Sequence, residues 1–180
     1  MEQKRCKWCN LGNEKYVQYH DHEWGVLNCE DCYLFEMLIL ESFQAGLSWE
    51  CVLNKREAFR EAYEQFDLEA VCAFDEAKLL ELQANKAIIR NKLKIKASVK
   101  NARIFREIVR EHGSFYEYLK QFSHGEIFVE CDRTTSPLSD AISMDLKKRG
   151  MTFVGTTIIY AYLQAIGIIN SHEDGCFLHP

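Results

Sequence analysis

The scarcity of proline constrains the fold of this chain more than any other sequence feature. Only two prolines occur in 180 residues, Pro137 and Pro180, and long stretches run uninterrupted between glycines. Such stretches suit helices better than the short, evenly punctuated strands of a β-sandwich. Because 47% of the residues are apolar, the chain can also bury a sizeable core. We therefore expect an all-α protein with a single domain over residues 1–180.

The apolar pattern and the capping residues place the expected helices. A strongly apolar helix covers residues 32–44 and stops at Gly46, since glycine favours the left-handed conformation that ends a helix. Ser48 caps a second helix that runs from Trp49 to about Gln65, and the pair should form a tight hairpin. Further helices are expected over residues 68–74, 75–84, 93–112, 114–122, 137–149 and 156–166, with a tight connection at 86–92 and a loop at 123–136.

The charge distribution suggests a nucleic-acid partner despite the net charge of −5. Residues 86–110 contain nine basic residues and a single acid, Glu107. A charge run usually marks a solvated helix face, but concentration of cations in an otherwise acidic chain favours a phosphate-contacting surface. The expected helix-turn-helix at about 84–112 would present backbone amides and basic side chains to DNA. The predicted phosphate contacts are Arg90, Lys92 and Lys94.

Several features predict a cytoplasmic protein without membrane association. No run approaches the ~20 apolar residues of a membrane span, and the first residues, MEQKRCKWC, lack the apolar centre of a signal peptide. The chain contains eight cysteines. In a reducing compartment they indicate metal ligands and buried thiols rather than disulfides.

The cysteines and histidines allow two alternative zinc sites. One set consists of the two CxxC pairs of a four-cysteine ribbon: Cys6, Cys9, Cys29 and Cys32. The other set would join the two ends of the chain in a tetrahedron of two cysteines and two histidines: Cys6, His20, His172 and Cys176. Spacing alone favours the ribbon, because two CxxC pairs are a stronger signal than scattered ligands.

Two further features indicate a binding pocket. The stretch from Tyr16 to Gly25, YVQYHDHEWG, combines aromatic rings with groups that can ligate a metal, and few folding roles require that mixture. Glu41 has the helical spacing of a mostly apolar stripe, where a carboxylate needs a partner. Glu41 either binds a ligand or lies at the helix end, where it reaches solvent or caps a neighbouring amide. We interpret the stretch at 16–25 as pocket wall and ligand source.

Four motifs, in order along the chain, resemble a known family. They are YxxYHDxEWG at 16–25, ESFQAGLSW at 41–49, KKRGMTFVGTTIIYAYLQAIGIINSH at 147–172 and a closing H-x3-C at 172–176. Together they resemble the bacterial 3-methyladenine DNA glycosylase I family of alkylation-repair enzymes. The resemblance spans the chain from Cys6 to Cys176. It implies a helix-hairpin-helix glycosylase fold with a structural zinc that joins the N- and C-terminal segments.

The resemblance also assigns roles to individual residues. It implies that the zinc ligands are the second set above, Cys6, His20, His172 and Cys176, which reverses the preference from spacing. Gly46 and Leu47 would enter the duplex where the target base has left. Glu41 would be the catalytic residue, through base recognition. The base pocket would comprise Trp8, Tyr16, Tyr19, Trp24, Glu41 and Trp49.

The implied reaction is base excision repair of alkylated double-stranded DNA. The enzyme would flip 3-methyladenine, hydrolyse its N-glycosidic bond and release the free base, leaving an abasic site. The expected helix after the hairpin lacks the aspartate of other helix-hairpin-helix glycosylases, and no lysine nucleophile can be assigned. We therefore expect a monofunctional, monomeric enzyme in the bacterial cytoplasm, acting at the nucleoid. The alternatives are a non-catalytic, zinc-stabilised module that binds damaged duplex and, with less support, a zinc hydrolase.

The residue types fit this chemistry on their own. Methylation at N3 makes adenine a delocalised cation and weakens its bond to deoxyribose, so recognition contributes much of catalysis. Aromatic rings stabilise a desolvated cation by ~1–2 kcal/mol or more per contact, and a carboxylate complements its charge.

The chain departs from the family pattern at three positions. Ala87 and Leu93 stand where relatives have glycines, so we expect the hairpin backbone to approach phosphate differently. Phe43 replaces a polar residue before Gln44, and we expect it to reshape the pocket floor.

Overall fold

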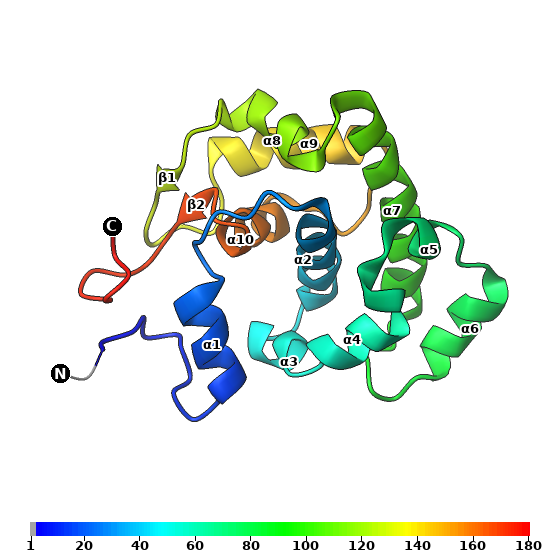
Figure 1. Cartoon of the computed structure of the whole chain (residues 1–180), viewed down its shortest axis with the longest axis horizontal. Helices are drawn as coiled ribbons and strands as arrows, with labels where there is room; N and C mark the ends of the chain where they lie inside the picture. Colours follow the sequence, from blue (N-terminus) through cyan, green and yellow to red (C-terminus); the bar gives the residue numbers. More distant parts are fainter. Residues whose placement is uncertain (1–2) are drawn as a thin grey trace.

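The computed structural model describes residues 3–180, so the first two residues of the domain expected over 1–180 lie outside the described part. This part is mostly helical (Figure 1). Its elements are α1 (Glu14–His22), α2 (Asp31–Gln44), α3 (Trp49–Leu53), α4 (Arg56–Ala62), the 3-10 helix η1 (Glu64–Phe66), α5 (Leu68–Cys72), α6 (Glu76–Ala84), α7 (Lys92–His112), α8 (Phe115–Ser123), β1 (Phe128–Val129), α9 (Pro137–Lys148), α10 (Thr156–Ala165) and β2 (Ile169–Asn170).

Helix α2 lies in the middle of the fold, between α10 on one side and α7 on the other (Figure 1). Ten of its 14 residues are buried, which is typical of a helix that is apolar on every face. The helix ends at Gln44 because Ala45 leaves the helical conformation, with φ −44° and ψ 112°. Gly46 then takes a positive φ of 82°. The sequence predicted this central helix and its end correctly.

The single helix expected over 49–65 is wrong. The structure has three short helices there, α3, α4 and η1. Residues 64–66 all have positive φ, a conformation that L residues rarely adopt and that stops a helix. The turn before α4 directs Arg56 toward α2, where its Nε donates to Glu36 at 2.9 Å. This buried ion pair holds α4 against α2.

The loop expected over 123–136 contains a strand. Strand β1 pairs in parallel with β2, with Phe128 opposite Ile169 and Val129 opposite Asn170. The expectation of an all-α protein is therefore corrected to a mostly helical one with a small two-stranded ladder. Strands of two residues are too short to show an alternating pattern. The ladder brings the residues after β1 next to the C-terminal segment.

Helix α7 is a 21-residue helix that begins one residue before its expected start. The Asn91 side chain caps it by accepting from the amides of Leu93 and Lys94, at 3.0 and 3.1 Å. Gly113, with φ 90°, ends it. Residues 85–91 connect α7 to α6, and the two helices pack against each other at one edge of the molecule (Figure 1).

The two ends of the described chain lie close together. The amide of Phe177 donates to the carbonyl of Lys4 at 2.8 Å, and the amide of Lys7 donates to Glu173 Oε2 at 3.0 Å. Figure 1 shows both termini on the same side, next to α1 and β2. Within residues 3–180, no helix combines the length and the apolar character needed to cross a bilayer.

Candidate active site

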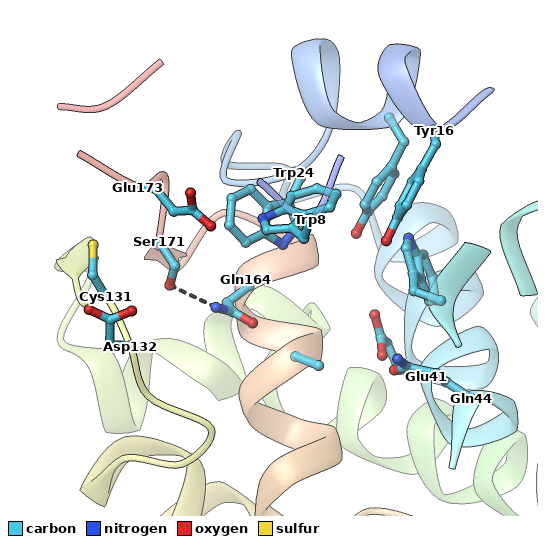
Figure 2. Close-up of a pocket in the computed structure, with 13 residues that line it drawn as sticks. Trp8, Tyr16, Trp24, Glu41, Gln44, Cys131, Asp132, Gln164, Ser171 and Glu173 are labelled. Atoms are coloured by element: carbon cyan, nitrogen blue, oxygen red, sulfur yellow. Dashed lines mark hydrogen bonds between the residues drawn. The ribbon is translucent and has the colours of Figure 1, made fainter. Parts of the chain in front are cut away.

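A cavity of about 290 Å³ lies between the two ends of the chain and helices α1, α2, α3 and α10. Figure 2 shows its walls. The structure brings all six residues of the predicted base pocket to this cavity: Trp8, Tyr16, Tyr19, Trp24, Glu41 and Trp49.

Helix α1 positions the aromatic wall. Tyr16 and Tyr19 lie three residues apart on this helix, which places them on the same face. The Trp8 ring packs against this wall, with its centroid 5.2 Å from that of Tyr16 and 4.7 Å from that of Trp24. Tyr19 lies 5.2 Å from Trp49 between ring centroids. The N-terminal segment over residues 8–24 and helix α3 thus contribute to one aromatic surface, suited to a flat ligand.

Glu41 is a buried carboxyl at the cavity wall. It is 3% exposed, and burial raises its pKa to about 8 because a low-dielectric environment disfavours the charged form. Within the described residues Glu41 Oε2 has no hydrogen-bond partner, and neither does the buried indole Nε1 of Trp49. Buried polar atoms are normally paired. Two buried polar atoms without partners at one cavity therefore indicate a polar ligand.

Sequence reasoning missed most of the opposite wall. That wall contains Gln164, whose Nε2 donates to Ser171 Oγ at 2.7 Å (Figure 2). Gln164 is a polar residue within the apolar helix α10, and this contrast was the available signal. Ala161 lies on α10, three residues before Gln164. The remaining residues depend on the β1–β2 ladder and had no local signal: Cys131, Asp132 and Glu173.

Gln44 is also part of the cavity lining. It follows Glu41 by three residues on α2, so both side chains lie on the same helix face. Phe43, by contrast, does not line this cavity, and the expectation that it reshapes the pocket floor is wrong. It is fully buried and packs against Phe59, with ring centroids 4.9 Å apart. The helical rotation between adjacent residues points it into the core.

Three of the four predicted zinc ligands form a cluster. The side-chain donor atoms of Cys6, His20 and Cys176 all lie within 4.8 Å of one another, and all three residues are buried. The ring of His20 is oriented by Asp21, whose Oδ1 lies 2.8 Å from Nδ1. Arg5 donates to Asp21, and this interaction lowers the pKa of Asp21. The cluster could hold a metal ion.

His172 lies next to the cluster. Its ring meets that of His20 edge to face, with centroids 5.1 Å apart. Its Nδ1 lies 2.8 Å from Asn170 Oδ1, and its buried Nε2 has no partner among residues 3–180. Burial lowers the pKa of His172 to about 4, so the ring is neutral at pH 7, the form that binds metals.

The ribbon of four cysteines, which spacing favoured, is wrong. Cys29 and Cys32 are exposed, and neither belongs to the cluster formed within the described chain. Cys9 is buried, but its Sγ lies 3.9 Å from the carbonyl of Tyr16. The two CxxC pairs do not come together in the structure. Helix α1 places His20 next to Cys6, in the position that a cysteine of the second pair would take in a ribbon.

The predicted DNA-contacting residues fall into two groups. Gly46 and Leu47 lie in the loop between the cavity residues Gln44 and Trp49, where Gly46 is exposed and Leu47 is 42% exposed. Arg90 and Lys92 are exposed at the start of α7. The structure therefore places four of the five predicted residues at the surface.

Lys94 is the exception, and its predicted role as a phosphate contact is wrong. It is 7% exposed, and its Nζ donates to the carbonyls of Phe43 at 2.8 Å and Ala45 at 2.5 Å. The side chain lies on the buried face of α7, beside the C-terminal end of α2. The carbonyls at the end of a helix lack partners within the helix, and they bind this ammonium.

The basic segment is also divided. Toward its C-terminal end, Arg106 pairs with Glu69 at 2.8 Å and Arg103 donates to the carbonyl of Cys72 at 3.1 Å. These cations hold α5 against α7. Toward its N-terminal end, exposed basic residues without an ion pair in the described structure remain for an anionic partner: Lys86, Arg90, Lys92, Lys96 and Lys100.

The hairpin backbone tolerates the two residues that replace glycines. Ala87 and Leu93 are not among the described residues with positive φ. The amide of Ala87 donates to Asn85 Oδ1 at 2.9 Å and that of Leu93 to Asn91. Leu93 is 69% exposed. The hairpin therefore presents an apolar side chain where a glycine would present bare backbone.

Known proteins resemble the chain over nearly its whole length. The methyladenine glycosylase family model matches residues 8–179. The chain is 40% identical to DNA-3-methyladenine glycosylase 1 of Escherichia coli K12, over 98% of this chain and 97% of that protein. It is 36% identical to DNA-3-methyladenine glycosylase of Haemophilus influenzae, over 96% of each chain.

Solved structures give the same relationship. A crystal structure of 3-methyladenine DNA glycosylase I matches with a TM-score of 0.94 at 42% identity, covering 98% of this chain and all of that one. A second, of a Y16F variant in complex with 3-methyladenine, matches with a TM-score of 0.89 at 31% identity, covering 96% and 97%. These matches span nearly the whole chain. The protein belongs to the methyladenine glycosylase family.

Proposed function

We propose that this protein is a DNA glycosylase that excises 3-methyladenine from alkylated double-stranded DNA. The observation that carries the proposal is the aromatic cavity with the buried, unpartnered carboxyl of Glu41. The names of the relatives support the same activity, and the structure of one of them contains 3-methyladenine.

The cavity suits the methylated base as it exists in DNA. N3-methylated adenine is a flat cation, which aromatic faces such as Tyr16 and Trp49 stabilise. The cation also favours the charged form of Glu41, because an opposite charge lowers a raised carboxyl pKa. The carboxylate then accepts from the exocyclic amine of the base. Ordinary adenine has neither the positive charge nor the weakened bond, so binding energy is directed at the lesion.

The reaction is hydrolysis through an oxocarbenium-like sugar. The N-glycosidic bond breaks with its electron pair going to the cationic base, which leaves as neutral 3-methyladenine. Water adds to C1′ and loses a proton, which leaves an abasic site. The negative charge of Glu41 helps to stabilise the positive charge that develops on the sugar. No lysine among residues 3–180 lines the cavity, so we propose a monofunctional enzyme without strand cleavage.

The base must leave the duplex to enter the cavity. We propose that Gly46 and Leu47, between the cavity residues Gln44 and Trp49, fill the space that the flipped base vacates. An apolar side chain inserted between base steps is a common device for this purpose. Arg90 and Lys92 at the start of α7 bind phosphates.

We propose that Cys6, His20, His172 and Cys176 hold a structural zinc. The orientation of both imidazoles supports this assignment, since each Nδ1 lies 2.8 Å from an oxygen acceptor, of Asp21 and Asn170 respectively. Metal-binding histidines usually donate their second N–H in this way. The unpartnered Nε2 of His172 would gain a ligand.

Four protein ligands fill a tetrahedral zinc and leave no position for water. The zinc would therefore stabilise the junction of the chain ends and would not activate water, which argues against a zinc hydrolase. One chain supplies every residue that lines the cavity. We accordingly propose that the enzyme acts as a monomer, in the bacterial cytoplasm where chromosomal DNA is located.

Incubation of the protein with methylated duplex, followed by analysis of released bases, tests the proposed function. We expect release of 3-methyladenine and tighter binding to lesion-containing than to intact duplex. A non-catalytic DNA-binding module would need the basic surface but not the cavity. Equal binding of both duplexes without base release would support that alternative and contradict the proposed function.

A further inference from the structure

The carbonyls at the end of α2 depend on a side chain from α7. Leu47 N donates to the carbonyl of Gln44 at 2.6 Å, so it does not satisfy the carbonyl of Phe43, its partner in a continued α-helix. The Lys94 ammonium fills that position and also binds the carbonyl of Ala45. A cation there also favourably offsets the negative end of the helix dipole.

The loop at 45–48, which Lys94 contacts at the Ala45 carbonyl, has open space around Gly46. A Cβ added to Gly46 would meet no atom within 4 Å, and Leu47 is 42% exposed. The loop lies between Gln44 and Trp49, which both line the cavity. Leu47 is therefore an exposed apolar side chain beside the cavity, two residues after the Ala45 carbonyl that Lys94 binds.

Lys94 also belongs to the first turns of α7, next to the exposed Lys92 and Arg90. At the N-terminal end of α7, Arg90 and Lys92 thus face solvent, whereas Lys94 faces the interior. Burial lowers the pKa of Lys94, which is the expected effect of removing an ammonium from water. Its carbonyl partners offset that desolvation, and without the ammonium they would be left unpaired.

The geometry points to Lys94 as a positioning residue that couples DNA docking on α7 to the placement of Leu47 beside the cavity. When Arg90 and Lys92 bind phosphates, they fix the position of the first turns of α7 on the duplex. The Lys94 ammonium, which binds the Ala45 carbonyl, then fixes the distance of the loop at 45–48 from the duplex. Lys94 itself contacts neither phosphate nor base. This inference rests on the proposed function, because Leu47 matters only if a base leaves the duplex.

The test compares Lys94→Met with the wild-type protein in three measurements. We expect the single-turnover rate constant for base release at saturating duplex to fall about tenfold or more, since a misplacement of the order of 1 Å can cost 100-fold. The affinity for free 3-methyladenine should stay within about twofold, because the cavity residues keep their places. The slope of log K against log salt for duplex binding should not change.

The salt slope distinguishes positioning from phosphate binding. Removal of a phosphate contact reduces the slope by about 0.9, and we expect that reduction for Lys92→Met but not for Lys94→Met. A reduced slope for Lys94→Met would overturn the inference. A wild-type rate constant in Lys94→Met, or a loss of free-base affinity equal to the loss of rate, would also overturn it.

A double-mutant cycle with Leu47→Ala tests the coupling itself. If Lys94 acts through Leu47, Lys94→Met should add little to the defect of Leu47→Ala, because interacting sites are not additive. Fully additive defects would contradict the inference. Thermal melting checks that each variant folds, and Lys94→Gln, which keeps a donor, replaces Lys94→Met under the same criteria if the latter does not fold. Absence of base release by the wild-type protein would instead refute the proposed function.

Discussion

The carboxyl of Glu41 and the indole of Trp49 are buried at the wall of one cavity, and each carries a polar atom without a partner in the described chain. Glu41 comes from α2 and Trp49 from α3, on either side of the loop at 45–48. When a bound cation ionises Glu41, its carboxylate offers an acceptor, and the indole N–H of Trp49 offers a donor. A ligand that satisfies both must be polar at its edge and flat enough to fit between the aromatic rings.

Replacement of Glu41 by Gln should weaken the binding of free 3-methyladenine. The amide keeps the shape but loses the charge, and a hydrogen bond to a charged group contributes roughly 1.5–3 kcal/mol. We expect an affinity loss of about 10- to 100-fold, measured by calorimetric titration of folded protein. The control is Glu61→Gln, at an exposed position of α4. Unchanged affinity in folded Glu41→Gln would refute the role assigned to Glu41.

The same substitution should change how stability depends on pH. The folded-state pKa of Glu41 is about 8 and its ordinary value is 4.5. Between these values the unfolded chain releases a proton that the ligand-free folded protein retains, so the wild-type protein loses stability as pH rises. The loss is at most about 1.4 kcal/mol per pH unit.

Urea unfolding of the wild-type protein and Glu41→Gln at pH 5, 6, 7 and 8 measures this effect. Other titrating groups are common to both proteins and cancel in the difference. We expect the stability of Glu41→Gln relative to wild type to increase across this range. A difference that is independent of pH would show that Glu41 is not protonated in the empty cavity.

Removal of the proposed zinc should unfold the junction between the chain ends. We expect Cys176→Ser to lose zinc and to melt at a lower temperature, since structural zinc contributes directly to folding free energy. Cys29→Ser should keep both its zinc and its melting temperature, because Cys29 is exposed and away from the cluster. Metal analysis and thermal melting of both variants provide the test, and loss of zinc from Cys29→Ser would contradict the ligand assignment.

Gly167 should be far less tolerant of alanine than Gly46. A Cβ at Gly167 would overlap the backbone of Val26 and Leu27, whereas one at Gly46 would meet no atom within 4 Å. Both glycines have positive φ, so alanine costs about 1 kcal/mol of backbone strain at either position. The difference in stability between the two variants therefore measures the steric overlap at Gly167. We expect Gly167→Ala to lose more than about 4 kcal/mol in urea unfolding. Equal losses in the two variants would show that residues 26–27 do not pack closely against residue 167.

The sequence allowed prediction of residues whose chemistry is unusual for their position. The mixture of aromatic and metal-capable groups at 16–25 predicted a pocket wall, and the carboxylate of Glu41 on an apolar stripe needed a partner. The resemblance then assigned Trp24 and Glu41 to the base pocket. The resemblance favoured the ligand set that joins Cys6 and His20 to the C-terminal end, whereas spacing alone favoured the ribbon of four cysteines. The order of the main helices followed from capping residues and apolar periodicity.

The features that were missed depend on contacts between distant segments. Lys94 resembles its exposed neighbours in sequence, and only the nearby end of α2 makes it a buried donor. Gln164 and Ser171 come together because a turn at Gly167 and a two-residue strand fold the chain back beside α10. Neither the periodicity of one segment nor its composition predicts such contacts.

The central claim is that this cavity excises 3-methyladenine, and measurement of base release under single-turnover conditions tests it most directly. The substrate is duplex DNA methylated at adenine N3, and the released bases are separated and quantified. We predict first-order release of 3-methyladenine, no release of unmodified adenine, and abasic sites without strand cleavage. Absence of 3-methyladenine release by folded wild-type protein at any salt concentration would contradict the claim.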